Sequence, residues 1–197
     1  MDWTIEFDKA IEQYLPDLEV LQDEPMSRHT TFRIGGPAKR MAFPSSREQL
    51  VLLMSFAKDY GANPLVIGNG SNLLVPDEGL DRLVIDTSAH LNRVEQGTGN
   101  TVIADAGATL ARTADFACKL GLAGLEFAHG IPGTVGGGVC MNAGAYGGEM
   151  KQVLRSAAVL FPEEGVRTLS CEELKLSYRH SLLTERPEAV VLYAEFA

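Results

Sequence analysis

The sequence has 197 residues, 45% of them hydrophobic, and its 17 basic and 26 acidic residues give a net charge of −9. A chain of this length and hydrophobicity can bury a sizeable core, as one large domain or two small lobes. No basic cluster exceeds the pair Lys39-Arg40, so a nucleic-acid partner is not expected. Since the overall charge repels anions, an anionic ligand would have to be held by local hydrogen-bond donors.

The sequence carries no signal for a metal site, a disulfide framework or a membrane segment. Its three cysteines are widely spaced, without a Cys-x-x-Cys pair: Cys118, Cys140 and Cys171. Its histidines show no metal-binding spacing, so no metal is expected. The first residues lack the basic and apolar regions of a signal peptide, and no apolar run approaches the ~20 residues of a membrane span. These features predict a cytoplasmic protein in a reducing compartment.

The chain begins with a pattern typical of an amphipathic helix. Residues 2–21 place apolar side chains at roughly helical spacing, with an interruption expected at Pro16. We therefore predict a helical arm over residues 1–24. Residues 25–32 carry little packing signal and are expected to form a connector. A turn at Gly35-Gly36-Pro37 and a short strand over residues 41–43 follow.

Residues 25–88 have the pattern of a first small α/β lobe. A capping-box pattern at residues 45–49 predicts the start of a helix that runs through Tyr60 and ends at Gly61. Short strands are predicted at residues 65–67, 73–75 and 83–86, with a loop over residues 68–72 after the first of them. Polar residues cluster at positions 87–93, where we place the boundary to a second lobe.

Residues 89–197 have the pattern of a second, α+β lobe. A strand is predicted at residues 101–106, with Gly107 after it, and a helix at residues 109–120, closed by Gly121. Further strands are predicted at residues 153–161, 166–169 and 190–196, with a turn at 162–165 and a capped helical turn at 170–174.

The most unusual stretch is the glycine-rich segment over residues 129–149. Eight of its 21 residues are glycine, out of 20 in the chain. Apolar residues alternate with these glycines, so the segment is not a solvated linker. Missing side chains allow the backbone to approach a ligand closely, and a pyrophosphate is the usual candidate. A glycine-rich packed turn is the alternative interpretation.

A second glycine-containing loop follows the predicted strand at residues 65–67. A strand that runs into the sequence Gly68-Asn69-Gly70-Ser71-Asn72 can present a nest of N–H donors to phosphate oxygens. The loop is not a Rossmann fingerprint, because Leu73 replaces the third glycine and Pro76 follows where a helix should run. No Gly-x-x-x-x-Gly-Lys-Ser/Thr motif occurs in the sequence, which excludes a P-loop.

Four ordered motifs resemble one enzyme family. They are residues 30–38, residues 68–75, residues 130–138 together with 141–149, and residues 176–181. In this order and spacing the chain, from about Pro25 to Ala197, resembles the UDP-N-acetylenolpyruvoylglucosamine reductases of peptidoglycan precursor synthesis. The resemblance implies an α+β, two-lobed FAD-binding domain of the PCMH (vanillyl-alcohol-oxidase-like) type. It also implies non-covalent FAD in a cleft between the two lobes.

The resemblance assigns residues to FAD. It implies that the pyrophosphate is held by Gly68, Asn69, Gly70, Ser71, Asn72 and Leu73. It implies that the ribityl chain and the flavin are held by Gly130, Pro132, Gly133, Thr134, Gly136 and Gly137, with Asn142, Gly144 and Ala145 completing the pocket. Gly107 and Arg33 are further cofactor candidates, although Arg33 fits a solvated arginine as well as a cofactor contact. Although His129 and Cys140 are possible covalent anchors, the resemblance implies non-covalent attachment, and the Val-Cys-Met setting indicates an inert thiol.

The resemblance also implies the reaction. NADPH reduces the flavin, which then reduces the enolpyruvyl group of UDP-N-acetylglucosamine enolpyruvate. Arg179 is the catalytic candidate, because a fixed guanidinium presents paired donors to the substrate carboxylate and stabilises its growing charge. Tyr178 is expected either to pack beside the flavin and substrate or to enter the core, and His180 either to take part or to stabilise a turn.

The sequence departs from the family in one respect. The resembling enzymes have a third, C-terminal domain that binds the UDP-sugar and supplies a serine proton donor and a late glutamate. No segment here matches these motifs, so we expect the sequence to represent the FAD-binding part, with little or no turnover alone. A non-catalytic FAD-binding module and another FAD oxidoreductase of the same fold, acting on a hydroxy acid or a sugar, are the alternatives.

Overall fold

The computed structural model describes residues 2–197 and divides the chain into two compact units, Met1–Leu91 (unit 1) and Asn92–Ala197 (unit 2). The division between Leu91 and Asn92 falls within residues 87–93, the polar stretch in which the sequence predicts the lobe boundary. Among residues 2–197, every helix is too short or too polar to cross a bilayer.

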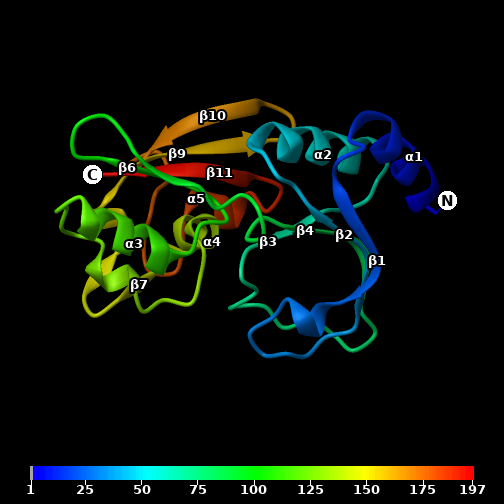
Figure 1. Ribbon diagram of the computed structural model, residues 1–197, viewed down its shortest axis with the longest axis horizontal. Helices are drawn as coiled ribbons and strands as arrows, with labels where there is room; N and C mark the ends of the chain where they lie inside the picture. Colours follow the sequence, from blue (N-terminus) through cyan, green and yellow to red (C-terminus); the bar gives the residue numbers. More distant parts are fainter. Residues whose placement is uncertain (1) are drawn as a thin grey trace. The chain divides into compact units, whose positions relative to one another are not determined.

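Unit 1 is built on a four-stranded mixed sheet in the order β1-β2-β4-β3. Strand β1 (Glu19–Pro25) pairs antiparallel with β2 (Pro37–Phe43), whereas β4 (Leu80–Asp86) runs parallel to both β2 and β3 (Leu65–Ile67). Helix α2 (Arg47–Asp59) connects β2 to β3, and α1 (Thr4–Tyr14) lies beside α2 (Figure 1). A 3-10 turn, η1 (Met26–Arg28), follows β1.

The core of unit 1 explains why these elements form. Met41 of β2 and Val84 of β4 are fully buried and pack with Met26 of η1. Helix α2 buries Leu50 and Leu53, one helical turn apart, as its apolar spacing predicts. Its start was also correctly predicted, because the Ser46 side chain accepts a hydrogen bond from the Gln49 N–H at 3.1 Å.

Three sequence predictions in unit 1 are wrong. The predicted helical arm ends early, because residues 19–25 pair with β2 as strand β1. A long-range partner that no local pattern reveals thus overrides the helical spacing there. Residues 73–75 form no strand, and the predicted connector is a packed element in which Met26 is fully buried.

Unit 2 is built on a five-stranded antiparallel sheet in the order β10-β9-β11-β6-β5. Its strands are β5 (Val94–Gln96), β6 (Val102–Asp105), β9 (Leu154–Phe161), β10 (Gly165–Ser170) and β11 (Val190–Phe196). Its helices are α3 (Leu110–Lys119), α4 (Val135–Cys140) and α5 (Leu182–Glu185), and a small hairpin joins β7 (Gly144–Ala145) to β8 (Gly148–Glu149). The 3-10 turns η2 (Glu126–Ala128) and η3 (Met150–Gln152) flank the glycine-rich segment.

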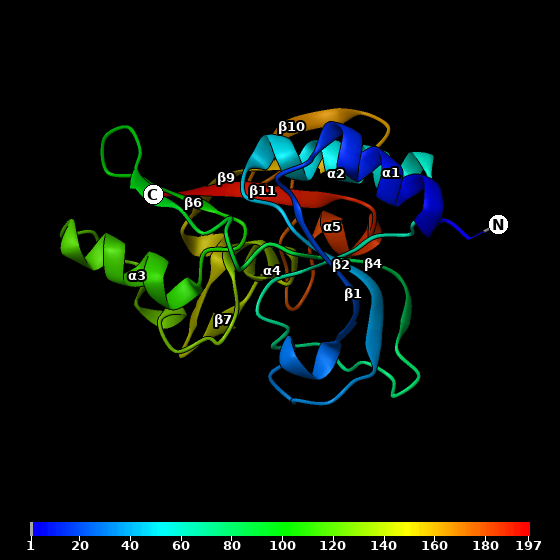
Figure 2. The ribbon, with the colours of Figure 1, turned by 45° about the vertical axis from the view of Figure 1, so that its right-hand side comes forward.

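The predicted elements of unit 2 are largely confirmed. Helix α3 starts at the Thr109 cap, whose hydroxyl accepts a hydrogen bond from the Arg112 N–H at 3.2 Å. The capped turn after β10 is present, because Ser170 and Glu173 each accept a hydrogen bond from the other's backbone N–H. Helix α4 packs on β11 and touches α5 (Figure 2).

The glycine-rich segment is partly helical, because α4 lies within it. Close packing against neighbouring residues explains why two positions of α4 are glycine. A Cβ added to Gly136 would lie 3.0 Å from the Ala106 Cβ, and one added to Gly138 would lie 3.2 Å from the Leu110 Cδ2. Both distances are tighter than ordinary side-chain contacts, so these two glycines allow α4 to approach the neighbouring elements closely.

Candidate functional site

In unit 1, the predicted phosphate loop leaves the end of β3 and lies against residues 29–31. Gly70 has φ 56°, and a Cβ at this position would overlap the backbone carbonyl oxygen of His29. The N–H of Thr31 donates to the Gly70 oxygen at 3.2 Å. Glycine is therefore required at position 70 twice, for its backbone conformation and for this close approach.

The same loop presents a row of unpaired donors. Within residues 2–197, no acceptor receives a hydrogen bond from the backbone N–H groups of residues 68–72. Gly70 is buried, and Gly68 and Ser71 are half-buried. Since buried backbone N–H groups are almost always paired in folded proteins, the loop has the donors that an anionic group such as a diphosphate needs.

Arg33 lies in the tight turn beside this loop. Thr30 is buried and donates its hydroxyl to the Ile34 oxygen at 3.0 Å, while the Arg33 N–H donates to the Thr30 oxygen. Arg33 itself is exposed and has φ 55°. The turn fixes the backbone of Arg33 but leaves its side chain in solvent, so a cofactor contact stays a prediction.

In unit 2, the glycine-rich segment has a packed part and an open part. The N–H groups of Val135 and Gly136 donate to the oxygens of Ala108 and Ala106, which ties α4 to the end of β6. Gly137, by contrast, is exposed, and a Cβ there would meet only the Thr134 hydroxyl at 4.0 Å. At Gly130 a Cβ would meet nothing within 4 Å.

The remaining predicted residues of this segment differ in exposure. Thr134 is buried, Gly133 is half-buried and Pro132 is exposed. Gly107 is buried next to Ala106, whereas Gly144 and Ala145 are half-buried in β7. The open face of the segment therefore contains Gly130, Pro132 and Gly137, which are its exposed predicted residues.

Asn142 is buried, with 2% of its surface exposed, and its side chain is fully engaged within unit 2. Its amide nitrogen donates to the Glu149 carboxylate at 2.9 Å and to the Ser177 backbone oxygen at 3.0 Å. Its amide oxygen accepts from the Lys151 N–H at 3.0 Å. Direct contact of this side chain with a cofactor stays a prediction, one that these contacts disfavour.

Tyr178 and Arg179 occupy the tip of a tight turn. Ser177 and His180 exchange backbone hydrogen bonds of 3.0 and 3.1 Å, and the two residues between them project outward. Tyr178 is 87% exposed, which rules out the core position considered for it. The Arg179 guanidinium carbon lies 5.7 Å from the centre of the Tyr178 ring.

His180 is occupied elsewhere. Its Nδ1 lies 2.8 Å from the Thr184 hydroxyl and its Nε2 3.3 Å from the Glu185 carboxylate, both in α5. The turn-stabilising interpretation of His180 is therefore the one that the structure supports. The exposed cationic group at the tip is Arg179.

Sequence reasoning missed Tyr146. It lies at the tip of the β7–β8 hairpin, is 96% exposed and has φ 53°, followed by Gly147 at φ 84°. Two successive positive φ values define a type I′ turn, which is a tight hairpin connection. The paired strands have only two residues each, too few to give a periodic signal. The exposed ring provides an aromatic surface suited to stacking.

The two residues considered as covalent anchors, Cys140 and His129, lie in different surroundings. Burial raises the pKa of the Cys140 thiol above its ordinary value, so little thiolate forms at neutral pH. His129 is exposed, with its Nε2 3.2 Å from the Asp115 carboxylate. Among residues 2–197, no cluster of three or more His, Cys, Asp or Glu side chains is arranged to hold a metal ion.

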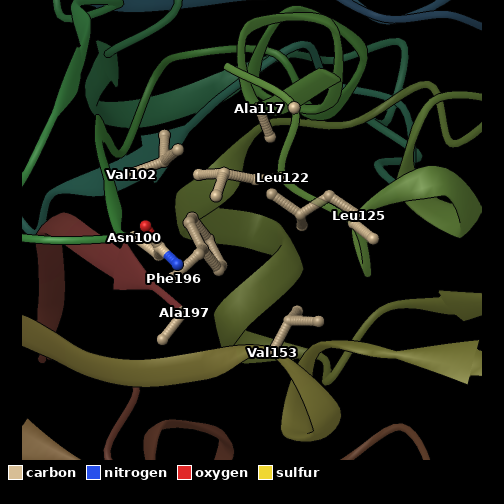
Figure 3. Close-up of a pocket in the computed structure, with 10 residues that line it drawn as sticks. Asn100, Val102, Ala117, Leu122, Leu125, Val153, Phe196 and Ala197 are labelled. Atoms are coloured by element: carbon tan, nitrogen blue, oxygen red, sulfur yellow. The ribbon is translucent and has the colours of Figure 1, made fainter. Parts of the chain in front are cut away.

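A pocket of about 330 Å³ lies elsewhere in unit 2 (Figure 3). It lies between the end of α3, the start of β9 and the end of β11, and it shares no residue with the predicted site. Its labelled side chains include Leu122, Leu125, Val153 and Phe196. The predicted site residues instead gather on the loop at residues 68–72 in unit 1 and on α4 and its neighbouring turns in unit 2.

Comparison with known proteins decides the family. Residues 38–170 match the family described as FAD binding domain. The chain belongs to this family of FAD-binding domains. It is 47% identical to the UDP-N-acetylenolpyruvoylglucosamine reductase of Agathobacter rectalis over 96% of its own length and 63% of that enzyme. The resemblance predicted from the four motifs is confirmed.

Solved structures of known proteins show the same fold. The chain resembles the crystal structure of UDP-N-acetylenolpyruvylglucosamine reductase from Thermus caldophilus, with a TM-score of 0.73 and 34% identity over 91% of this chain and 61% of that one. Cholesterol oxidase from Brevibacterium sterolicum has the same fold, with a TM-score of 0.65, 16% identity and 92% and 38% coverage. The predicted α+β, two-lobed fold is thus confirmed. The chain spans less than two thirds of the length of these reductases.

Proposed function

We propose that this FAD-binding domain holds FAD without a covalent bond and forms the flavin part of a UDP-N-acetylenolpyruvoylglucosamine reductase. The observation that carries the proposal is the row of unpaired N–H groups at residues 68–72. The proposal rests equally on the family match over residues 38–170.

The donor set fits a diphosphate. The chain has a net charge of −9, and neutral backbone donors attract phosphate oxygens without needing a basic cluster. We assign residues 68–73 to the pyrophosphate. Gly70 is the central residue, because its contact with His29 fixes the loop before any ligand arrives and pre-organisation reduces the cost of binding.

We assign the flavin end of the cofactor to unit 2. The supporting observation is that Gly130, Pro132 and Gly137 are exposed and that an added Cβ at either glycine would meet no close neighbour. We assign six further residues to the same flavin site, as the resemblance implies: Gly107, Gly133, Thr134, Gly136, Gly144 and Ala145. The raised pKa of Cys140, caused by burial, supports non-covalent attachment.

When bound, FAD would supply hydride transfer between NADPH and the enolpyruvyl nucleotide. Arg179 would bind the carboxylate of that nucleotide, since a guanidinium presents two parallel donors to two carboxylate oxygens. The same contact stabilises the negative charge that grows on the carboxylate as the double bond is reduced. Tyr178 packs beside Arg179 at the tip of the turn and would cover one side of the bound group.

We propose that the chain takes part in the NADPH-dependent reduction of UDP-N-acetylglucosamine enolpyruvate to UDP-N-acetylmuramate, for peptidoglycan synthesis in the cytoplasm. The match covers 96% of this chain and 63% of the Agathobacter enzyme. We therefore expect the chain by itself to bind FAD but to turn over poorly, because the proton donor has no match in this sequence.

Titration of the purified chain with FAD and with riboflavin tests the proposal. Each hydrogen bond to a charged group contributes about 1.5–3 kcal/mol, so the pyrophosphate should make FAD bind at least about tenfold more tightly than riboflavin. Equal affinities would show that the loop at residues 68–72 does not hold a diphosphate. No binding of either molecule would contradict the proposed function.

A further inference from the structure

The turn that carries Tyr178 and Arg179 is held by two contacts with the end of α4. Ser177, on one side of the turn, accepts through its backbone oxygen a hydrogen bond of 3.0 Å from the Asn142 amide. Ser181, on the other side, is fully buried and donates its hydroxyl to the Cys140 oxygen at 2.6 Å. One anchor thus meets Cys140, the last residue of α4, and the other meets Asn142, two residues beyond the helix.

We propose that Asn142 is a positioning residue, which fixes the Tyr178–Arg179 turn through the Ser177 carbonyl. This inference rests on the proposed function where it concerns Arg179 and its carboxylate ligand. Its structural part, that the Asn142 amide holds the turn, stands on the contacts alone.

The chemistry of the amide supports this assignment. Asn142 has φ 43°, a left-handed conformation that asparagine tolerates better than most residues. A backbone role alone would therefore explain an asparagine here. That role does not require the side chain to be buried with its amide nitrogen directed at two acceptors, Glu149 and Ser177.

The Ser177 carbonyl is the point at which the turn is fixed. It accepts from the His180 N–H within the turn and from Asn142 outside it, which occupies both oxygen lone pairs. Because Tyr178 and Arg179 are exposed, few other contacts of their own fix the tip. Loss of the Asn142 donor should therefore loosen the tip without unfolding unit 2.

The variant Asn142→Asp tests the hydrogen-bond donor of the Asn142 side chain. Aspartate has the same shape, tolerates the same φ and keeps the oxygen that accepts from Lys151, but it loses the N–H groups that face Ser177 and Glu149. The double variant Asn142→Asp with Glu149→Gln removes the repulsion between the two carboxylates while the Ser177 contact stays broken. Asn63→Asp is the matched control, because Asn63 has φ 46° and lies in unit 1.

Hydrogen exchange of the chain without flavin is the first measurement. We expect the Ser177 and His180 amides to exchange at least about tenfold faster in Asn142→Asp and in the double variant, the factor that corresponds to about 1.4 kcal/mol. The amides of β9 and β11 should exchange as in the parent chain, and Asn63→Asp should leave the turn unchanged. Unchanged exchange at Ser177 and His180, or equal acceleration throughout unit 2, would overturn the inference.

The second measurement uses the FAD-loaded chain and follows the flavin absorbance during titration with UDP-N-acetylglucosamine enolpyruvate. We expect Asn142→Asp and Arg179→Lys each to weaken nucleotide binding at least about tenfold, and Asn142→Asp to change FAD affinity by less than about threefold. If nucleotide binding is weakened by Arg179→Lys but not by Asn142→Asp, the positioning role of Asn142 is contradicted and the role of Arg179 stands. If Arg179→Lys has no effect while the turn amides exchange faster, the structural part of the inference stands and the proposed role of Arg179 fails.

Discussion

Gly70 lies directly against the backbone carbonyl of His29, so closely that any side chain at position 70 would overlap the His29 oxygen. The contact joins the loop at residues 68–72 to the tight turn that contains Arg33. It fixes the loop while the N–H groups of residues 68–72 stay unpaired within residues 2–197. The phosphate-binding role proposed for the loop therefore depends on a contact between backbone segments.

Gly70→Ala should lower both stability and FAD affinity. Gly61→Ala is the matched control, because Gly61 also has a positive φ, of 70°, but a Cβ there would meet nothing within 4 Å. The control should lower the free energy of unfolding by about 1–2 kcal/mol, the cost of a left-handed alanine. Gly70→Ala should lower the free energy of unfolding by more than this, because the His29 backbone cannot move aside.

Urea unfolding and FAD titration of the two variants measure these effects. FAD affinity should fall at least about tenfold in Gly70→Ala and stay within about threefold of the parent in Gly61→Ala. Equal FAD affinities in both variants would show that the loop does not hold the cofactor.

Gly137→Ala should stabilise the chain and weaken FAD binding. Gly137 lies within α4 and is exposed, with room for a methyl group. Replacement of a helical glycine by alanine raises the free energy of unfolding by about 0.5–1 kcal/mol. If the flavin lies against the backbone of Gly137, the added methyl group occupies the space of the flavin and weakens FAD binding.

Thermal unfolding without FAD and a parallel FAD titration check this prediction. The control is Gly138→Ala, which should destabilise because its Cβ would press on Leu110. A Gly137→Ala chain that is more stable and binds FAD as tightly as the parent would exclude Gly137 from the flavin site.

Arg179→Gly should separate stability from ligand binding. Arg179 has φ 53°, a conformation that costs a residue with a side chain about 1–2 kcal/mol, so glycine should leave the chain as stable or more stable. The carboxylate of the enolpyruvyl nucleotide should bind at least about tenfold more weakly. Isothermal titration of the FAD-loaded variant measures this loss, and unchanged nucleotide affinity would contradict the role of Arg179.

Thiol labelling should distinguish Cys118 from Cys140. Cys118 is exposed, whereas burial raises the pKa of Cys140 above its ordinary value. Because the thiolate is the reactive form, Cys140 should react only as the pH rises towards this higher pKa. Mass spectrometry after iodoacetamide treatment at pH 8 should find Cys118 modified first. Earlier modification of Cys140 would show that its thiol is not protected.

Local sequence signals predicted the elements that local interactions define. Helices α2 and α3 begin at Ser46 and Thr109 because these side chains cap the backbone within three residues. Strand β1 was not predicted, because its Val20 and Leu21 are paired with Ala42 and Met41 in a distant part of the sequence. Pairing over such a separation leaves no periodic signal in the strand itself.

The sequence motifs predicted which residues belong to the candidate site, but not how these residues contact one another. The motifs identified the loop at residues 68–72 and the Tyr178–Arg179 turn, because their glycine and arginine residues have recognisable chemistry. They did not show that the Asn142 amide contacts the Ser177 backbone, since a side chain's partner depends on the folded chain. Nor did they separate the packed Gly136 and Gly138 from the open Gly137.

The absorbance spectrum of the purified chain, with and without NADPH under anaerobic conditions, tests the central claim most directly. We predict the bands of oxidised flavin, released into solution on denaturation because the FAD is not covalently attached, and loss of these bands when NADPH is added. Bands that persist with NADPH would show that hydride transfer to the flavin needs more than these residues. A chain that contains no flavin and takes up none when FAD is added would contradict the account.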